Sequence, residues 1–282
     1  MSKFKNRRTG IWGAVAVGGT ALTVALSGTA FGVSAQTQLA AQTSSSAPQP
    51  TVVLVHGAFA DASGWNGVIQ RLQSRGYKVV APANPLRGLA NDSAYIRSVL
   101  KTIDGPIVLA GHSYGGAVIS EAAADNPNVK ALVYVSAFMP KEGESLKGLG
   151  DMYSGSELNT ALDPRPYDGS AGGGTDLYIK QDKFRSVFAA DLPCDQANAM
   201  FAGQRPIDAV SFGETATKAA WETIPSWAIV AKQDKAIAPD LERFEAKRAK
   251  SRTVEINSSH VAMTSHPGVV ADVVTEAARS VR

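Results

Sequence analysis

The sequence contains very little cysteine. Cys194 is the single cysteine among 282 residues, so the chain cannot form an intrachain disulfide, even in an oxidising compartment. No histidine or second cysteine stands beside Cys194 to activate its thiol. We therefore interpret Cys194 as a small, partly buried residue and not as a reactive group.

An excess of basic residues is also missing once the N-terminus is set aside. Residues 1–35 hold four of the 28 Lys and Arg residues and none of the 25 Asp and Glu residues. The remainder has 24 basic and 25 acidic side chains, a formal charge of −1. A nearly neutral surface gives no electrostatic steering toward charged polymers. The sequence therefore predicts no nucleic-acid partner.

The N-terminus has the layout of a bacterial export signal. The basic segment MSKFKNRRTG is followed by the apolar stretch IWGAVAVGGTALTVALSGTAFGV, as in the n-region and h-region of a signal peptide. Val33-Ser34-Ala35 supplies the small residues that a signal peptidase reads, so we expect cleavage after Ala35, with Ala30 as the alternative. The mature chain would begin near Gln36 and be secreted or periplasmic, without stable membrane association.

An uncleaved membrane anchor is the alternative interpretation, because the apolar stretch approaches the length that spans a bilayer of roughly 30 Å. Its content of Gly, Thr and Ser disfavours retention in the membrane. Arg7-Arg8 leaves both Sec and twin-arginine export open.

The rest of the chain alternates between two patterns. Residues 36–50 are small and polar and contain proline, which predicts a flexible linker. In residues 51–282, short β-branched runs alternate with amphipathic stretches. We expect strands at 51–57, 78–84, 106–111, 131–138, 226–234 and 252–259, and helices at 64–75, 91–103, 115–126, 238–250 and 267–281. This order predicts an α/β fold with a mostly parallel six-stranded sheet and helices on both faces.

Residues 140–217 interrupt the alternation. They contain no strong strand pattern, several Pro and Gly residues, and helical segments near 180–190 and 193–203. A connection of this length between two strands is usually functional. The segment LYIKQDKFRSVFAADL is too rich in aromatic and apolar residues to stay solvated. We therefore predict a helical cap over the functional site.

The strongest chemical signal is Gly111-His112-Ser113-Tyr114-Gly115, which lies between the apolar run PIVLA and the helical pattern AVISEAAAD. Small residues on both sides of a serine let a strand turn sharply into a helix, so that the hydroxyl stands out at the edge of the sheet. The first N–H groups of the helix then point at the reacting centre, where negative charge develops. The motif predicts that Ser113 is a nucleophile.

A serine nucleophile needs a base, and on this kind of turn the acid and the base follow the serine along the chain. Of the four histidines, only His260 and His266 come after Ser113. His260 directly follows the last expected strand, whereas His266 precedes Pro267 at the start of a helix. We assign the role of base to His260.

Two aspartates compete for the role of the acid. Asp234 ends the run SWAIVAKQD, at the same edge of the sheet as Ser113. Asp240 begins a helix, where an acidic residue is explained by the helix dipole. We therefore assign the acid to Asp234, which would accept a hydrogen bond from the base.

The oxyanion of an acyl-transfer intermediate needs two N–H donors. We expect one from Tyr114, which follows the nucleophile, and one from Ala58, with Phe59 as the alternative. His56 is interpreted as a residue that orders this loop. Phe59 and Trp65, together with the Tyr114 ring, are candidates for lining the substrate pocket, although a core position explains each of them equally well.

Four segments together carry a resemblance to a known family: VLVHGAFADASGW, AGHSYGGAVI, IVAKQDKAIAP and SSHVAMTSHP. They resemble the α/β-hydrolase superfamily, in particular the small serine esterases related to plant methyl-ester hydrolases and hydroxynitrile lyases, and their bacterial relatives. The resemblance extends over residues 51–281 and is weak within 140–217.

The resemblance implies that Ser113, His260 and Asp234 form a catalytic triad and that Ala58 and Tyr114 form the oxyanion hole, with no metal and no organic cofactor. Hydroxynitrile lyases place a lysine directly after the catalytic histidine. This chain has Val261 there, which argues against cyanohydrin cleavage.

We therefore expect a carboxylesterase-type serine hydrolase that acts on a small ester. The same triad would also serve lactone hydrolysis, perhydrolysis or cofactor-free oxygenation, since fold and triad do not separate these reactions. A non-catalytic protein that binds a small ligand is a further alternative, which the intact set of Ser, His and Asp disfavours. A hydrolase of polymer surfaces would need an open site. The natural ester and the oligomeric state stay open.

Overall fold

The computed structural model describes residues 48–169 and 172–281. The expected signal peptide and most of the expected linker lie outside these residues. The first strand begins at Thr51, where the sequence pattern predicts the start of the folded domain.

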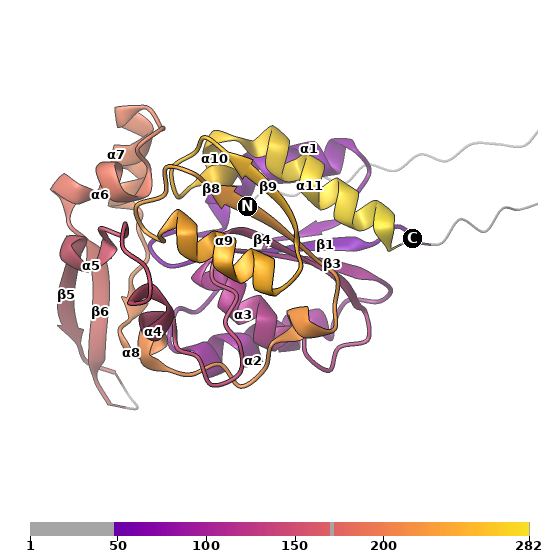
Figure 1. Ribbon diagram of the computed structural model, residues 1–282, viewed down its shortest axis with the longest axis horizontal. Helices are drawn as coiled ribbons and strands as arrows, with labels where there is room; N and C mark the ends of the chain where they lie inside the picture. Colours follow the sequence, from indigo (N-terminus) through magenta and orange to yellow (C-terminus); the bar gives the residue numbers. More distant parts are fainter. Residues whose placement is uncertain (1–47, 170–171, 282) are drawn as a thin grey trace, which may run out of the picture. The chain divides into compact units, whose positions relative to one another are not determined.

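A six-stranded sheet forms the centre of the described chain (Figure 1). Its strands lie in the order β2-β1-β3-β4-β8-β9, and every neighbouring pair is parallel. They are β1 (Thr51–Val55), β2 (Val79–Val80), β3 (Ile107–Ser113), β4 (Val129–Ala137), β8 (Ser226–Ala231) and β9 (Arg252–Ile256). The predicted fold class is confirmed. Strand β2 is shorter than expected, and it lies at the edge of the sheet, where it pairs with β1 alone.

Helices cover both faces of this sheet (Figure 1). On one face α1 (Asn66–Ser74) packs against α11 (Pro267–Ser280), and on the other α2 (Leu89–Leu100) packs against α3 (Tyr114–Ala122). The other core helices are η1 (Ala62–Trp65), η2 (Ala220–Glu222), α9 (Pro239–Arg248) and α10 (Ala262–Ser265). The helices predicted from the 3.6-residue pattern all form.

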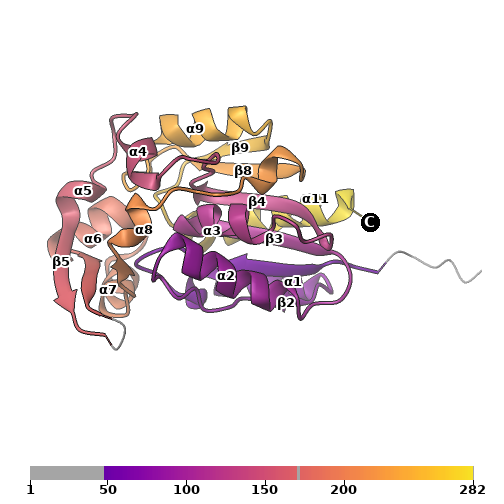
Figure 2. The same cartoon turned by 90° about the horizontal axis from the view of Figure 1, so that it is seen from below.

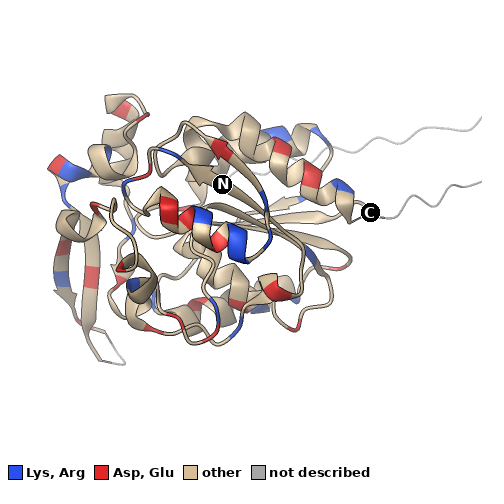
Figure 3. Cartoon of the chain, in the orientation of Figure 1, with Lys and Arg blue, Asp and Glu red and all other residues tan. Residues whose placement is uncertain are grey.

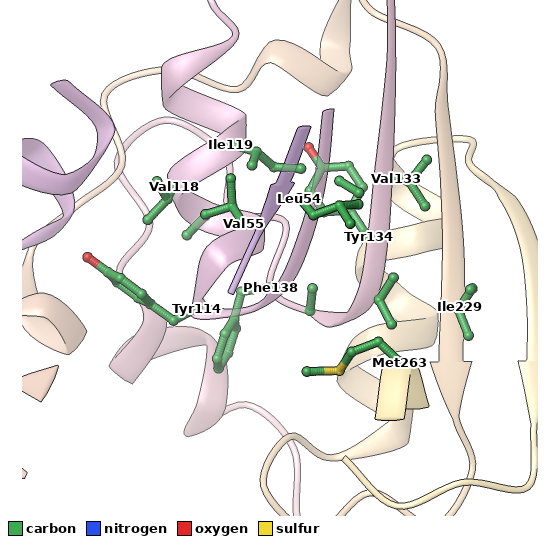
Figure 4. Packing of buried hydrophobic residues seen from close by; sticks show 14 of the residues in the cluster. Leu54, Val55, Tyr114, Val118, Ile119, Val133, Tyr134, Phe138, Ile229 and Met263 are labelled. Carbon is green, nitrogen blue, oxygen red and sulfur yellow. The ribbon is translucent and has the colours of Figure 1, made fainter. Parts of the chain in front are cut away.

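The core lies between the sheet and these helices. Every residue of β1 and of β3 is buried, as expected for parallel strands that are covered on both faces. Figure 4 shows Leu54 of β1, Ile119 of α3 and Tyr134 of β4 gathered in this core. Burial of this kind contributes about 1.5–3 kcal/mol for each large apolar side chain, so the central strands are held firmly in position.

The connection between β4 and β8 forms a second group of elements at one end of the main sheet (Figures 1 and 2). Its elements are α4 (Leu146–Gly150), α5 (Leu158–Ala161), β5 (Leu162–Tyr167), β6 (Gly174–Ile179), α6 (Gln181–Phe188), α7 (Cys194–Ala202), β7 (Ile207–Asp208) and α8 (Val210–Gly213). Helices α6 and α7 match the two predicted helical segments. We call the connection the insertion, residues 140–217.

The insertion also contains a three-stranded antiparallel sheet, in the order β5-β6-β7, which the sequence did not predict. Strand β5 carries Pro164 and Pro166, and proline is confined to edge strands because it has no N–H to donate. Because of these two prolines the sequence pattern did not indicate strand β5, which lies at the edge of its sheet. The insertion is therefore of mixed structure and not purely helical.

Cys194 is exposed at the first position of α7. In this helix Ala197 is buried, and Met200 and Phe201 are partly buried against the core, whereas Cys194 lies outside this packed face. The interpretation of Cys194 as partly buried is wrong, because this position at the start of α7 is exposed to solvent.

The surface agrees with the near neutrality of the sequence after residue 35. Acidic and basic residues are interspersed along the outer helices (Figure 3). Within the described ranges, no helix combines the length and the apolar character required to cross a bilayer.

Gly115 lets β3 run directly into α3. A Cβ atom at this position would lie 2.7 Å from the carbonyl oxygen of Val55 in β1, closer than real Cβ contacts allow. The absence of a side chain therefore sets how closely the first turn of α3 approaches the central strand, and so fixes where the Ser113 turn lies.

Helix α9 packs against β8 and buries two carboxyl groups, those of Glu242 and Glu245. Glu245 Oε1 accepts a hydrogen bond of 2.7 Å from the Met139 N–H. Burial raises the pKa of Glu245 to about 8, although the Met139 N–H and the charge of Arg248 act in the opposite direction. Between pH 4.5 and about pH 8, the Glu245 carboxyl therefore keeps its proton in the native protein and loses it in the unfolded chain.

We predict that Gly115→Ala lowers the free energy of unfolding by about 1–3 kcal/mol, because the added methyl group must push β1 or α3 aside. Denaturant unfolding measures this change. Gly150→Ala in α4 is the matched control, since no atom lies within 4 Å of its added Cβ. The control should be neutral or stabilised by up to about 1 kcal/mol. Equal stability of Gly115→Ala and the parent would contradict the close packing of the turn.

We also predict that the stability of the protein depends on pH through Glu245. Between the ordinary pKa of 4.5 and about 8, Glu245 is ionised in the unfolded chain and protonated in the native protein. The unfolded state then binds fewer protons, so this group makes stability fall as pH rises, by up to about 1.4 kcal/mol per pH unit. Glu245→Gln should flatten the decline in urea midpoint between pH 5 and pH 8, relative to the parent. An unchanged slope would show that Glu245 does not carry the proton.

Candidate active site

Ser113 is the last residue of β3 and directly precedes α3. Its backbone has φ 54° and ψ −126°, a strained conformation for a residue with a side chain. Such strain is typical of a serine on a tight turn from strand to helix. The geometry leaves the residue 7% exposed, at the carboxyl end of a central strand.

His260 and Asp234 form a buried pair. The distance between His260 Nδ1 and Asp234 Oδ2 is 2.5 Å, and both side chains are almost fully buried. Asp234 Oδ1 accepts two further hydrogen bonds, from the Ala236 N–H at 2.7 Å and the Ile237 N–H at 2.9 Å. A carboxylate only accepts hydrogen bonds, so the proton on the ring lies at Nδ1 and Nε2 is left as the basic nitrogen.

The two competing residues lie elsewhere. Asp240 is exposed and pairs with Arg243 at 2.8 Å. His266 is the N-cap residue of α11, and its Nδ1 lies 2.8 Å from the Ser265 hydroxyl oxygen. Neither contacts the His260 ring through a hydrogen bond, so the structure brings together the acid and the base that the sequence analysis selected.

His112 connects the Ser113 turn with the His260 loop. The distance between His112 Nε2 and the His260 carbonyl oxygen is 3.0 Å, and the two ring centroids are 4.7 Å apart. Burial and the neighbouring His260 lower the pKa of His112 well below its ordinary value, so this ring is neutral. Among the described residues the Ser113 hydroxyl makes no hydrogen bond. The link from Ser113 to His260 is therefore not formed in this structure.

The loop after β1 passes directly beside Ser113. A Cβ atom at Gly57 would lie 2.6 Å from the Ser113 Cβ. The Phe59 N–H donates to the Arg205 carbonyl oxygen at 3.0 Å and is thus occupied. Within the described chain the Ala58 N–H makes no hydrogen bond, and the Tyr114 N–H is the first of α3, without a partner inside the helix. The free donors are those of Ala58 and Tyr114.

His56 holds this loop in place. Its Nε2 accepts from the Asn84 N–H at 2.9 Å, its Nδ1 lies 2.9 Å from the Gly57 carbonyl oxygen, and the Asn84 side-chain amide donates to the His56 carbonyl at 3.0 Å. Burial lowers the pKa of His56 to about 4. The ring is therefore neutral and structural, as the sequence analysis expected.

The three aromatic pocket candidates have different surroundings. Phe59 lines a cleft of about 260 Å³, together with Met200 of α7 and Thr264 of α10. Trp65 is fully buried in the core. The Tyr114 hydroxyl donates to Asp92 at 2.7 Å, which turns the ring toward α2. Of the three, only Phe59 lines this cleft.

The insertion contributes two residues that the sequence analysis missed. The Phe188 ring centroid lies 5.0 Å from that of His260 and 6.1 Å from that of Phe59. Asp191 accepts a short hydrogen bond from the Ser259 hydroxyl and another of 3.1 Å from the Ser259 N–H. Burial opposes ionisation of Asp191, but the Ser259 hydrogen bonds outweigh it and lower its pKa. The sequence shows that this segment is rich in aromatic residues, but it does not show which loop the segment contacts.

No group of three or more His, Cys, Asp or Glu side chains within residues 48–169 and 172–281 is arranged to hold a metal ion. The chemistry that the site can perform is acid–base and nucleophilic. A serine, a histidine that is oriented by a carboxylate, and two free N–H groups are the elements that acyl transfer requires.

The comparisons with known proteins agree with this geometry. The model of the alpha/beta hydrolase family matches residues 52–273. The alpha/beta hydrolase nvfD of Aspergillus novofumigatus is 26% identical over 255 residues, which cover 82% of this chain and 97% of that protein. The pyrethroid hydrolase of Sphingobium wenxiniae is 30% identical over 158 residues, which cover 50% of this chain and 55% of that protein.

Among solved structures, polyneuridine aldehyde esterase superposes with a TM-score of 0.70 at 22% identity, over 81% of this chain and 99% of that one. A likeness at this level of identity shows the fold. The family match confirms the resemblance that the four sequence segments carry. The chain belongs to the alpha/beta hydrolase family and is a hydrolase of the carboxylesterase type.

Proposed function

We propose that the chain hydrolyses small carboxylic esters, with Ser113 as nucleophile, His260 as base and Asp234 as the acid that orients it. The observation that carries the proposal is the buried hydrogen bond of 2.5 Å between His260 and Asp234. A histidine that donates its Nδ1–H to a carboxylate presents a basic Nε2. The carboxylate also stabilises the ring when it becomes positively charged.

In the proposed reaction the Ser113 oxygen attacks the ester carbonyl while His260 Nε2 takes the hydroxyl proton. The resulting oxyanion accepts hydrogen bonds from the Ala58 and Tyr114 N–H groups. The C–O bond then breaks, and the leaving alcohol takes the proton from His260. Water attacks the acyl-enzyme with His260 again as base, which releases the carboxylic acid and restores Ser113. A positioned base contributes about 10²–10⁴-fold in rate, and an oxyanion donor about 10²–10³-fold.

The enclosure of the site supports small substrates. Ser113 is 7% exposed and His260 only 1%, and Phe188 of the insertion packs against the His260 ring. These contacts also support our proposal that residues 140–217 act as a cap. A polymer surface does not fit a nucleophile this enclosed.

The direct test is the hydrolysis of short p-nitrophenyl esters by the purified chain and by Ser113→Ala. We expect Ser113→Ala to lose about 10⁴-fold or more in kcat, because the nucleophile is removed. Asp234→Asn should lose about 10⁴-fold with little change in KM, since the wrong tautomer of His260 would be favoured.

A serine-directed phosphonate supplies the control. It should label the parent at Ser113 and leave Ser113→Ala unlabelled. If the folded parent neither hydrolyses the esters nor takes up the label, a serine-hydrolase mechanism is ruled out.

A further prediction concerns Asp191, which acts on His260 through Ser259. Asp191→Ala should lower kcat about 10-fold or more, because two partly buried hydrogen bonds that fix the residue before His260 are lost, while KM changes little. Asp182→Ala is the matched control, since Asp182 is an exposed acidic residue of the neighbouring helix α6. A fall in melting temperature without a fall in kcat would contradict a positioning role for Asp191.

A further inference from the structure

Glu242 of α9 has a side chain buried directly behind the candidate triad. The residue is 3% exposed. Its Oε2 accepts a hydrogen bond of 3.1 Å from the Ala231 N–H, at the end of β8. The Ala231 carbonyl oxygen in turn accepts the Asp234 N–H at 3.1 Å. One residue of β8 therefore holds Glu242 and Asp234 at the same strand end.

Glu242 Oε1 is buried and has no N–H or O–H donor among the described residues. After burial itself, the strongest influence on the Glu242 carboxyl is the charge of the Asp234 side chain. Two ionised carboxylates held at one buried strand end repel each other, and Glu242 Oε1 has no donor to offset this repulsion. One carboxyl of this pair must therefore be protonated.

The surroundings decide which of the two carries the proton. Asp234 accepts three N–H hydrogen bonds, from His260, Ala236 and Ile237, whereas Glu242 accepts one. Hydrogen bonds to the charged form favour that form, so the negative charge is accommodated on Asp234. Burial, followed by the charge of Asp234, raises the pKa of Glu242 well above its ordinary value.

The other charged groups around α9 do not offset this. Glu245, one turn further along the helix, adds negative charge where it is ionised. Arg248 pairs with Glu144 at 2.6 Å and lies 3.9 Å from Glu245. Among the described residues, no Lys, Arg or His forms an ion pair with Glu242. An ionised Glu242 would therefore have no cationic partner, so a proton neutralises the charge of its carboxyl.

We propose that Glu242 is a positioning residue for the candidate triad, a neutral carboxylic acid whose O–H donates a hydrogen bond to the Asp234 carboxylate. The inference rests on the proposed role of Asp234. A neutral donor fixes the Asp234 carboxylate in the orientation that His260 needs, and it adds no second negative charge beside the imidazole. An ionised Glu242 would repel the Asp234 carboxylate. Its negative charge would also favour the protonated form of the His260 ring, so that His260 would hold its proton more tightly.

Infrared spectroscopy reads the protonation of Glu242 without any assay of activity. Glu245→Gln serves as the background, because it removes the second buried carboxyl. We expect its spectrum at pH 7 to contain a carboxylic-acid C=O band that disappears when Glu242→Gln is added. A spectrum in which Glu242→Gln removes no carboxylic-acid band overturns the proposal, whether or not the chain hydrolyses esters.

Kinetics then test the positioning role. Glu242→Leu removes the donor, so kcat should fall about 10-fold or more with KM little changed. Glu242→Gln restores a neutral donor of the same shape, so kcat should recover, and the acid limb of kcat/KM against pH should stay at its parental position. A shift of that limb by about 1–3 pH units in Glu242→Gln would mean that a charge had been removed and would overturn the proposal. If the parent hydrolyses no ester, the proposed function fails, and the infrared result alone decides the state of Glu242.

Discussion

The buried hydrogen bond between Asp234 and His260 requires a negative charge at a place where water cannot solvate it. An isolated buried carboxylate is strongly unfavourable, so its surroundings have to stabilise it. Asp234 receives the Ala236 and Ile237 N–H groups from the loop that leads into α9, and the His260 ring from the loop after β9. Under our proposal, Glu242 adds a fourth donor. The hydrogen-bond donors at this end of β8 are therefore arranged to stabilise one charge, that of the Asp234 carboxylate.

The parallel sheet explains why the sequence predicts so much of the site. When all strands run in one direction, the residues after each strand meet at one edge. The short β-branched runs before Ser113, Asp234 and His260 fix where those strands end, so their order along the chain is enough to bring them near one another. The same reasoning identified Ala58, because it lies in the loop that follows β1.

The parts that the sequence did not predict depend on contacts between segments that share no local pattern. Asp191 meets Ser259, which lies 68 positions further along the chain, and nothing near either residue signals the pairing. Glu242 looks like an ordinary acid in the first turn of a helix, where the helix dipole already accounts for it. Strand β5 was hidden by Pro164 and Pro166, since proline normally argues against a strand.

The insertion is hydrogen-bonded to the loop that carries the candidate base and to the loop that carries a candidate oxyanion donor. Asp191 holds Ser259, directly before His260, and the Arg205 carbonyl holds the Phe59 N–H, directly after Ala58. Any movement that lifts this part of the insertion would break these hydrogen bonds and disturb the candidate base and the candidate oxyanion hole together. We infer that α6 and the chain after α7 stay in place during the reaction, so that substrate enters past them.

The protonation states around Ser113 lead to a conclusion about how the oxyanion is stabilised. His56 and His112 are neutral, because burial lowers the pKa of both rings, and Asp234 is already negative. The proposed reaction adds a second negative charge, on the substrate oxygen, in the same buried region. With neutral imidazoles on either side, that charge is met by backbone N–H groups and by the imidazolium that forms on His260 in the same step. Since that cation would exist only while the oxyanion does, the proposed mechanism stabilises the transition state and not the neutral ester.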